Sequence, residues 1–134
     1  MVDKSIDIIW IIIAINATML IVGLHLMVNP PKSKSEYMGL NMPSKLAPLT
    51  DETWSEFHKY SGKIMAIGNF FALSLSLLLY KFELPKLTAS KLMGFYYIYL
   101  MISLLIIIFT TYILTETHLE KIFDKEGNRK IKKS

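Results

Sequence analysis

Three long stretches of the chain contain no charged residue, and polar intervals separate them. They run from Ile8 to Val28, from Ile64 to Tyr80 and from Leu92 to Thr115. The hydrocarbon layer of a membrane, about 30 Å thick, needs roughly 20 apolar residues in a helix that rises about 1.5 Å per residue. The first and third stretches meet this length directly, and the second meets it when Lys63 and Lys81 extend their ammonium groups outward. The pattern predicts three transmembrane helices over these stretches.

Two alternatives fit the pattern less well. The helices of a soluble bundle keep a polar stripe at a period of about 3.6 residues, and the stretch 100–108 has almost no polar position. A signal peptide that is removed after export is shorter than the first stretch and ends at a small-x-small cleavage site, which is absent here. The first stretch instead ends at Asn29-Pro30-Pro31, which stops a helix. We expect it to remain as an anchor.

The polar interval 29–63 divides into a loop and a helix. Prolines, serines and lysines exclude a long helix before Leu49. A helix is predicted from Thr50 onward, because this threonine is a suitable N-cap and the two acidic residues after it favour the positive end of the helix dipole.

One face of the predicted helix 50–63 carries Trp54, Phe57, Ser61 and Ile64, at spacings of three, four and three. We expect an amphipathic helix at the membrane surface, which either bends at Gly62 or runs straight into the second span. The predicted protein is all-α: a three-span membrane domain, 1–115, with spans 8–28, 64–80 and 92–115 and the loop 29–63, followed by an amphipathic and basic tail, 116–134.

Charge changes this picture only by suggesting an orientation. With three spans, four of the 15 Lys and Arg residues lie on the side of the amino terminus, and the other eleven lie with the long loop and the tail. The positive-inside rule therefore predicts an amino terminus outside and a carboxyl terminus in the cytoplasm, although the lysine-rich 81–91 loop works against it. The last four cations of the tail form a small basic patch, which suits anionic lipid better than nucleic acid; they are Arg129, Lys130, Lys132 and Lys133.

Polar residues inside the predicted spans are Asn16, Thr18, His25 and Asn69. Hydrogen bonding between helices is the simpler interpretation, and a ligand or proton-relay role is the alternative. His25 is expected at the interface rather than on a metal, because no histidine or carboxylate lies three or four residues after it.

The second span carries a packing stripe beside Asn69. Gly68, Ala72 and Ser76 recur every four residues, which lets two helices approach closely. We expect Asn69 to be able to pair with Asn16 or Thr18 across the bundle.

No catalytic or metal-binding motif is present. The chain has no cysteine, which excludes disulfides and thiolate sites, and it has no serine-hydrolase, zinc-protease or phosphate-loop motif. Glu52, Glu56 and His58 are clustered, but positions 56 and 58 are about 200° apart on a helix. A site with His118 would require the fold to bring it to this cluster. We predict no enzyme activity, no cofactor and no metal.

The polar interval also carries a pattern of spaced residues: Gly39 and Ser44, then Asp51-Glu52-x-Trp54-x-x-x-His58-Lys59-x-x-Gly62-Lys63. This resembles the SdpI/YhfL family of small bacterial membrane proteins, most specifically in the spacing of Trp54, His58 and Gly62. The resemblance covers most of residues 8–115. The family has an arginine two residues after the glycine, where this chain has Asn41.

The resemblance implies a multi-pass protein of the bacterial plasma membrane that gives immunity to a secreted, membrane-active killing peptide and holds a cytosolic repressor at the membrane. It implies binding roles for Gly39, Asn41, Trp54, His58, Lys59 and Gly62. The alternative function is an accessory subunit that stabilises or regulates a larger membrane complex or transporter. Its partner would then be that complex, or further copies of the chain in a homo-oligomer. A minimal transporter or ion-conducting oligomer ranks last, because three spans with few buried charges offer a poor pathway.

Overall fold

The computed structural model describes residues 4–34, 44–83 and 89–131 of the chain. These ranges contain three helices: α1 (Lys4–Val28), α2 (Asp51–Glu83) and α3 (Ala89–Ile122). No β-strand occurs within them, apart from an isolated bridge in the tail. By length and composition, each helix is apolar enough to cross a membrane. The all-helical fold with three such helices is confirmed.

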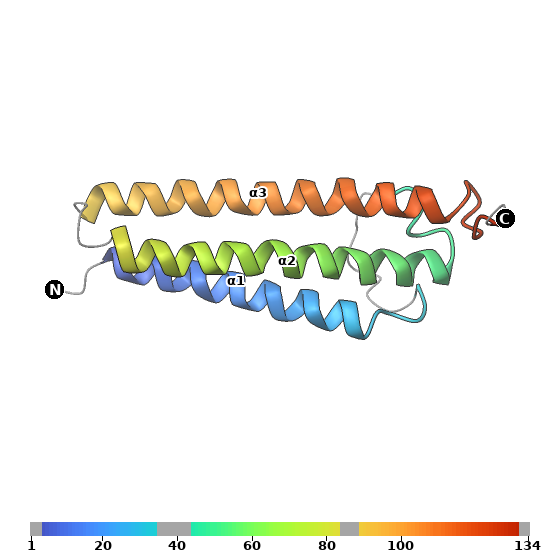
Figure 1. The fold of residues 1–134 in the computed structure, drawn as a ribbon, viewed down its shortest axis with the longest axis horizontal. Coiled ribbons are helices and arrows are strands. Elements are labelled where there is room, and N and C mark those ends of the chain that lie inside the picture. The colour runs from blue at the N-terminus through green and yellow to red at the C-terminus, as the bar shows by residue number, and fades with distance from the viewer. Residues whose placement is uncertain (1–3, 35–43, 84–88, 132–134) are drawn as a thin grey trace.

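The three helices lie side by side with alternating directions (Figure 1). The helices α2 and α3, with 33 and 34 residues, are longer than α1, with 25. They extend past α1 at the end of the bundle that holds the carboxyl terminus (Figure 1).

The predicted separate surface helix is not present among the described residues. Residues 51–63 are the first turns of α2, which continues without interruption to Glu83, so the straight alternative is the one observed and the bend at Gly62 is not. The helix α3 likewise passes the predicted boundary between 115 and 116 and ends at Ile122.

The start of α2 follows from Thr50, as predicted. The Thr53 backbone N–H donates to the Thr50 hydroxyl at 3.1 Å, and the Thr50 N–H donates in return to the Thr53 hydroxyl at 2.9 Å. This reciprocal cap satisfies two backbone donors at a helix end.

Gly62 has a different role from the one expected, because α1 crosses α2 there. A Cβ atom on Gly62 would lie 2.7 Å from the Gly23 carbonyl oxygen, and a Cβ atom on Gly23 would lie 2.7 Å from the Gly62 carbonyl oxygen. Each glycine lets the backbone of the other helix approach, as small residues do where helices cross.

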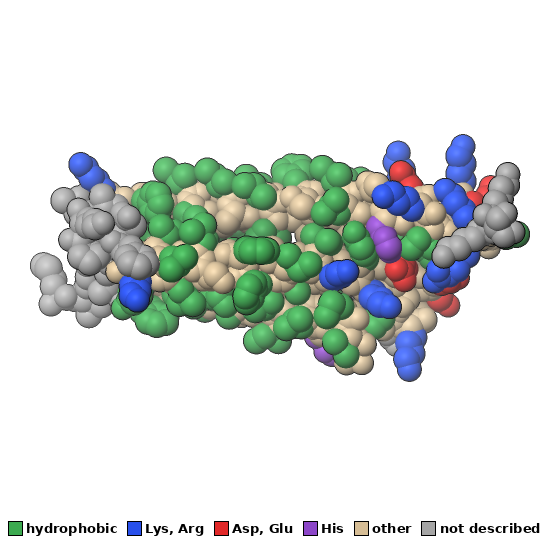
Figure 2. Space-filling model, in the orientation of Figure 1, with side chains coloured by type: hydrophobic (Ala, Val, Ile, Leu, Met, Phe, Trp, Pro, Cys, Tyr) green, Lys and Arg blue, Asp and Glu red, His purple; other side chains and the backbone are tan. Residues whose placement is uncertain are grey.

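The middle of the bundle presents apolar side chains outward, whereas charged side chains gather at its ends (Figure 2). Phe71, Ile98, Ile106 and Phe109 are each more than half exposed. Soluble monomers rarely expose apolar surface on this scale. Two buried apolar clusters lie at opposite ends of the bundle: one around Ile9, Ile12 and Tyr96, the other where α2 begins and α3 ends.

Candidate functional site

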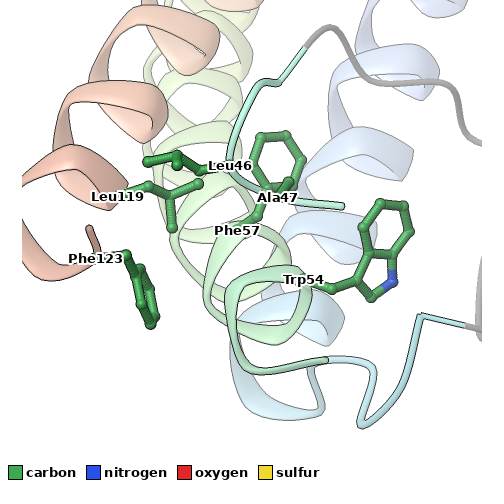
Figure 3. Packing of buried hydrophobic residues seen from close by; sticks show 6 residues of the cluster. All are labelled: Leu46, Ala47, Trp54, Phe57, Leu119 and Phe123. Atoms are coloured by element: carbon green, nitrogen blue, oxygen red, sulfur yellow. The ribbon is translucent and has the colours of Figure 1, made fainter. Parts of the chain in front are cut away.

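The candidate site is the charged end of the bundle, residues 44–63 and 115–131, called the head below. Its centre is an apolar cluster to which the 44–50 loop, α2, the end of α3 and the tail all contribute (Figure 3). The members are Leu46, Ala47, Trp54, Phe57, Leu119 and Phe123. The predicted apolar face of the tail is confirmed in Leu119 and Phe123, with Ile122 packed against the cluster.

Trp54 and His58 are inside the head, not on its surface. The His58 side chain is fully buried, and its Nδ1 lies 2.8 Å from the Trp54 carbonyl oxygen. A carbonyl can only accept, so Nδ1 carries the proton. The imidazole also packs against the Trp54 and Phe57 rings, with centroid distances of 4.5 and 5.3 Å. Trp54 also belongs to the apolar cluster that includes Leu46 and Ala47 of the 44–50 loop.

Other residues of the family-like pattern lie in different surroundings. Lys59 is exposed on α2, and Gly62 is at the crossing with α1. Ser44 donates its hydroxyl hydrogen to the Glu116 carboxylate at 2.7 Å. Gly39 and Asn41 lie outside the described residues.

Glu56 and His118 join α2 to α3. The His118 Nε2 lies 2.9 Å from a Glu56 carboxylate oxygen, and the imidazole stacks on the Tyr60 ring at 3.8 Å with an interplanar angle of 4°. The fold thus brings His118 to one member of the predicted acidic cluster. No group of three metal-ligating side chains occurs in the part of the chain that is described.

The tail folds back onto the start of α2. Gly127 has a φ of 83°, and a Cβ atom on it would lie 3.0 Å from the Leu49 Cβ. Arg129 forms an ion pair with Glu52. The helix α3 ends at Ile122, and Gly127 and Asn128 lie in a turn after it, in which the Asn128 carbonyl accepts from the Asp124 N–H at 2.9 Å. Of the predicted basic patch, Lys132 and Lys133 fall beyond the described ranges.

The polar side chains of the bundle interior link its helices differently from the prediction. The Asn16 amide donates to the Ser76 hydroxyl over 3.4 Å. The Tyr99 hydroxyl donates to the Ala72 carbonyl at 2.8 Å and receives a hydrogen bond from Ser76 at 3.2 Å. Tyr99 therefore belongs to this network.

Asn69 does not pair with Asn16 or Thr18. Its amide nitrogen donates to the Met65 carbonyl at 2.8 Å, and the Thr18 hydroxyl donates to the Ala14 carbonyl. The Oδ1 atoms of Asn16 and Asn69 are buried and have no hydrogen-bond partner among the described residues.

The packing stripe of α2 faces the neighbouring helices. A Cβ atom on Gly68 would lie 3.2 Å from an Ile107 side-chain carbon. The Ala72 carbonyl accepts the hydrogen bond from the Tyr99 hydroxyl of α3. The Ser76 hydroxyl accepts the hydrogen bond from Asn16 of α1. His25 is exposed in the last turn of α1, away from these contacts.

Comparison with known protein families, with characterised proteins and with solved structures finds no match to this chain. The family resemblance stays a prediction.

Proposed function

We propose that the chain is an integral protein of the bacterial plasma membrane, of immunity or sensing type, which binds a membrane-active peptide or a cytosolic regulator. One observation supports this above the others. Trp54, His58 and Gly62 follow each other along one buried side of α2, so the three most specific positions of the family resemblance form one continuous seam between α2, the 44–50 loop and α1.

The apolar side chains that are exposed around the middle of the bundle support the membrane placement. Asp51 precedes Ile64 by 13 residues in one continuous helix, which corresponds to about 20 Å. With 64–80 in the hydrocarbon, the head therefore stands outside it. The positive-inside rule places the head in the cytoplasm.

Within this proposal the residues that carry the family resemblance divide by exposure. Trp54 and His58 are buried and act by holding the head in shape. Lys59 is exposed on the same stretch of helix and is available to contact a partner directly.

A protection assay tests the proposal. A bacterium that is sensitive to a membrane-active killing peptide is made to express the chain, and its survival is measured. We expect protection, lost in Lys59→Ala but kept in Lys63→Ala, which removes another exposed lysine one turn further along α2. Membrane-fraction immunoblots control for the amount inserted. Equal survival of all strains at equal expression would refute the proposal.

The accessory-subunit alternative is favoured by a different observation. An apolar groove of about 570 Å³ runs between α2 and α3, with Gly68, Ala72 and Tyr99 among its lining residues. A helix of a larger membrane protein would fit along it. This alternative predicts stoichiometric co-purification with such a protein in mild detergent, lost on Ala72→Leu and kept on Ser74→Leu.

A further inference from the structure

A second groove, of about 530 Å³, lies between α1 and α2 on the apolar part of the bundle. Its lining is apolar except for Lys63, and Leu24, Ala66 and Ile67 are among the lining residues. Ala66 is buried, whereas Leu24 and Ile67 are 43% and 46% exposed, so the small side chain lies at the bottom and the larger ones form the sides. The volume is within the range of about 300–1,000 Å³ typical of binding pockets.

The charged residue of the lining lies at one end of the groove. Lys63 directly precedes the uncharged stretch 64–80, and Met27, which lines the groove from α1, lies one residue before the end of the stretch 8–28. Both helices therefore place this end at the boundary of the hydrocarbon layer. From Lys63 the lining continues along α2 to Phe71, eight residues or about 12 Å. One leaflet contributes about 15 Å of hydrocarbon, so the groove spans most of a leaflet.

No carboxylate neutralises the Lys63 ammonium group among the described residues. The lining of the groove contains no acidic residue, and Lys63 is exposed and forms no ion pair within those ranges. The nearest acidic residue on α2 is Glu56, seven positions earlier, and it contacts His118. The groove thus offers a ligand one positive charge at the membrane boundary and apolar surface below it.

We propose that this groove binds one anionic phospholipid of the surrounding bilayer, with its phosphate beside Lys63 and one acyl chain along Leu24, Ala66 and Ile67. Such a lipid carries its charge at the boundary and its chain toward the middle of the membrane, in the same order as the groove presents its lysine and its apolar side chains. Basic pockets between membrane helices hold anionic headgroups in this way. The inference goes beyond the proposed function and shares with it only the membrane placement.

Charge and depth favour a lipid over the other occupants. The groove between α2 and α3 has no charged lining residue, so it offers an anionic headgroup no attraction, whereas this groove does. A soluble peptide would have to enter the hydrocarbon to reach Ile67, and its backbone polar groups would lose their hydrogen bonds to water there. A phospholipid is already at that depth.

The test uses the full chain in nanodiscs of phosphatidylcholine that contain a minor share of phosphatidylglycerol as the anionic probe. The protein is extracted in mild detergent, and native mass spectrometry measures the phospholipid that each chain retains. We expect one retained phosphatidylglycerol molecule, enriched over its share in the nanodisc. Lys63→Ala is expected to lower this enrichment about fivefold, the effect of one lysine near an anionic headgroup.

Lys91→Ala is the matched control for the charge. Lys91 is also exposed and also borders an uncharged stretch, 92–115, but it does not line the groove. We expect Lys91→Ala to retain phosphatidylglycerol as the original chain does.

A second pair of variants tests the apolar part of the groove. Ile67→Trp fills it with a larger side chain and is expected to abolish the retention of phosphatidylglycerol. Leu78→Trp makes a comparable change at a residue of α2 that is 52% exposed and outside the groove, and it is expected to retain the lipid.

Three results would overturn the proposal: retention of the two lipids in proportion to their shares, an unchanged enrichment in Lys63→Ala, or unchanged retention in Ile67→Trp. An equal loss in Lys91→Ala would assign the effect to any lysine at the membrane boundary and also overturn it. Failure of the proposed function is measured separately, because the protection assay depends on Lys59, and Lys63→Ala is expected to keep protection although it loses the lipid.

Discussion

Gly23 and Gly62 fix the distance between α1 and α2, because the Cβ of any larger residue would meet backbone. A Cβ on Gly62 would lie 2.7 Å from the Gly23 carbonyl oxygen, which no rotamer change can move. Gly62→Ala is therefore expected to destabilise the bundle by about 1–3 kcal/mol. Reversible unfolding in mixed micelles measures this.

The chain offers a matched control for that substitution. Gly94 is also in a helix, and a Cβ on it would meet nothing within 4 Å. Gly94→Ala should therefore stabilise the protein by up to about 1 kcal/mol, the helix-propensity difference between the two residues. An equal effect of both substitutions would show that the crossing is not tight.

Asn69 is a second residue whose environment decides whether a substitution stabilises or destabilises the protein. Its Oδ1 is buried without a partner, and its amide nitrogen only adds a bond to a helical carbonyl. Asn69→Leu replaces the unsatisfied oxygen by apolar surface of similar size, so we expect a gain of about 1–2 kcal/mol in the same unfolding measurement. A loss of stability instead would show that an interior water satisfies Oδ1.

These residues also show which features of the structure could be predicted from the sequence and which could not. Thr50 could be identified as a cap because a cap depends on neighbours within three residues. The roles of Gly62 and Tyr99 depend on Gly23 and Ala72, which lie 39 and 27 positions away along the chain. Nothing in the sequence pairs these positions until the register between helices is known.

At the scale of elements, the head holds together the start of α2, the end of α3 and the tail. The Glu56–His118 contact, with Tyr60 stacked on the imidazole, is its polar link between the two helices. Both side chains are about a quarter exposed, so solvent weakens the pair. A double-mutant cycle of Glu56→Ala and His118→Ala is expected to give a coupling of about 0.5–1 kcal/mol.

The cycle of Glu56→Ala with Lys121→Ala is the control, because Lys121 is exposed and outside this contact. Its coupling should be zero within error. Equal couplings in both cycles would mean that the Glu56–His118 pair contributes nothing of its own.

The long helices themselves were predictable from uncharged stretches. Their extension into the head was not, because amphipathic turns at the surface and turns packed in a small folded head carry the same sequence pattern.

At the scale of the whole molecule, the proposed membrane placement puts the head on one side of the membrane. The chain has no cysteine, so a single introduced thiol reports its side without background. Glu126 lies in the exposed turn of the tail, and Lys81 is exposed near the opposite end of α2. The eleven cations on the side of the head predict that it faces the cytoplasm.

In intact cells, a membrane-impermeant maleimide should therefore label Lys81→Cys and leave Glu126→Cys unlabelled until the cells are lysed. Labelling of Glu126→Cys alone would show the opposite orientation, with the head outside the cell. A cytosolic regulator could then no longer reach the head, and a membrane-active peptide that arrives from outside would be the partner that meets the exposed Lys59. The same pair of thiols therefore decides whether a cytosolic regulator can be the partner of the head, because such a regulator is present on only one side of the membrane.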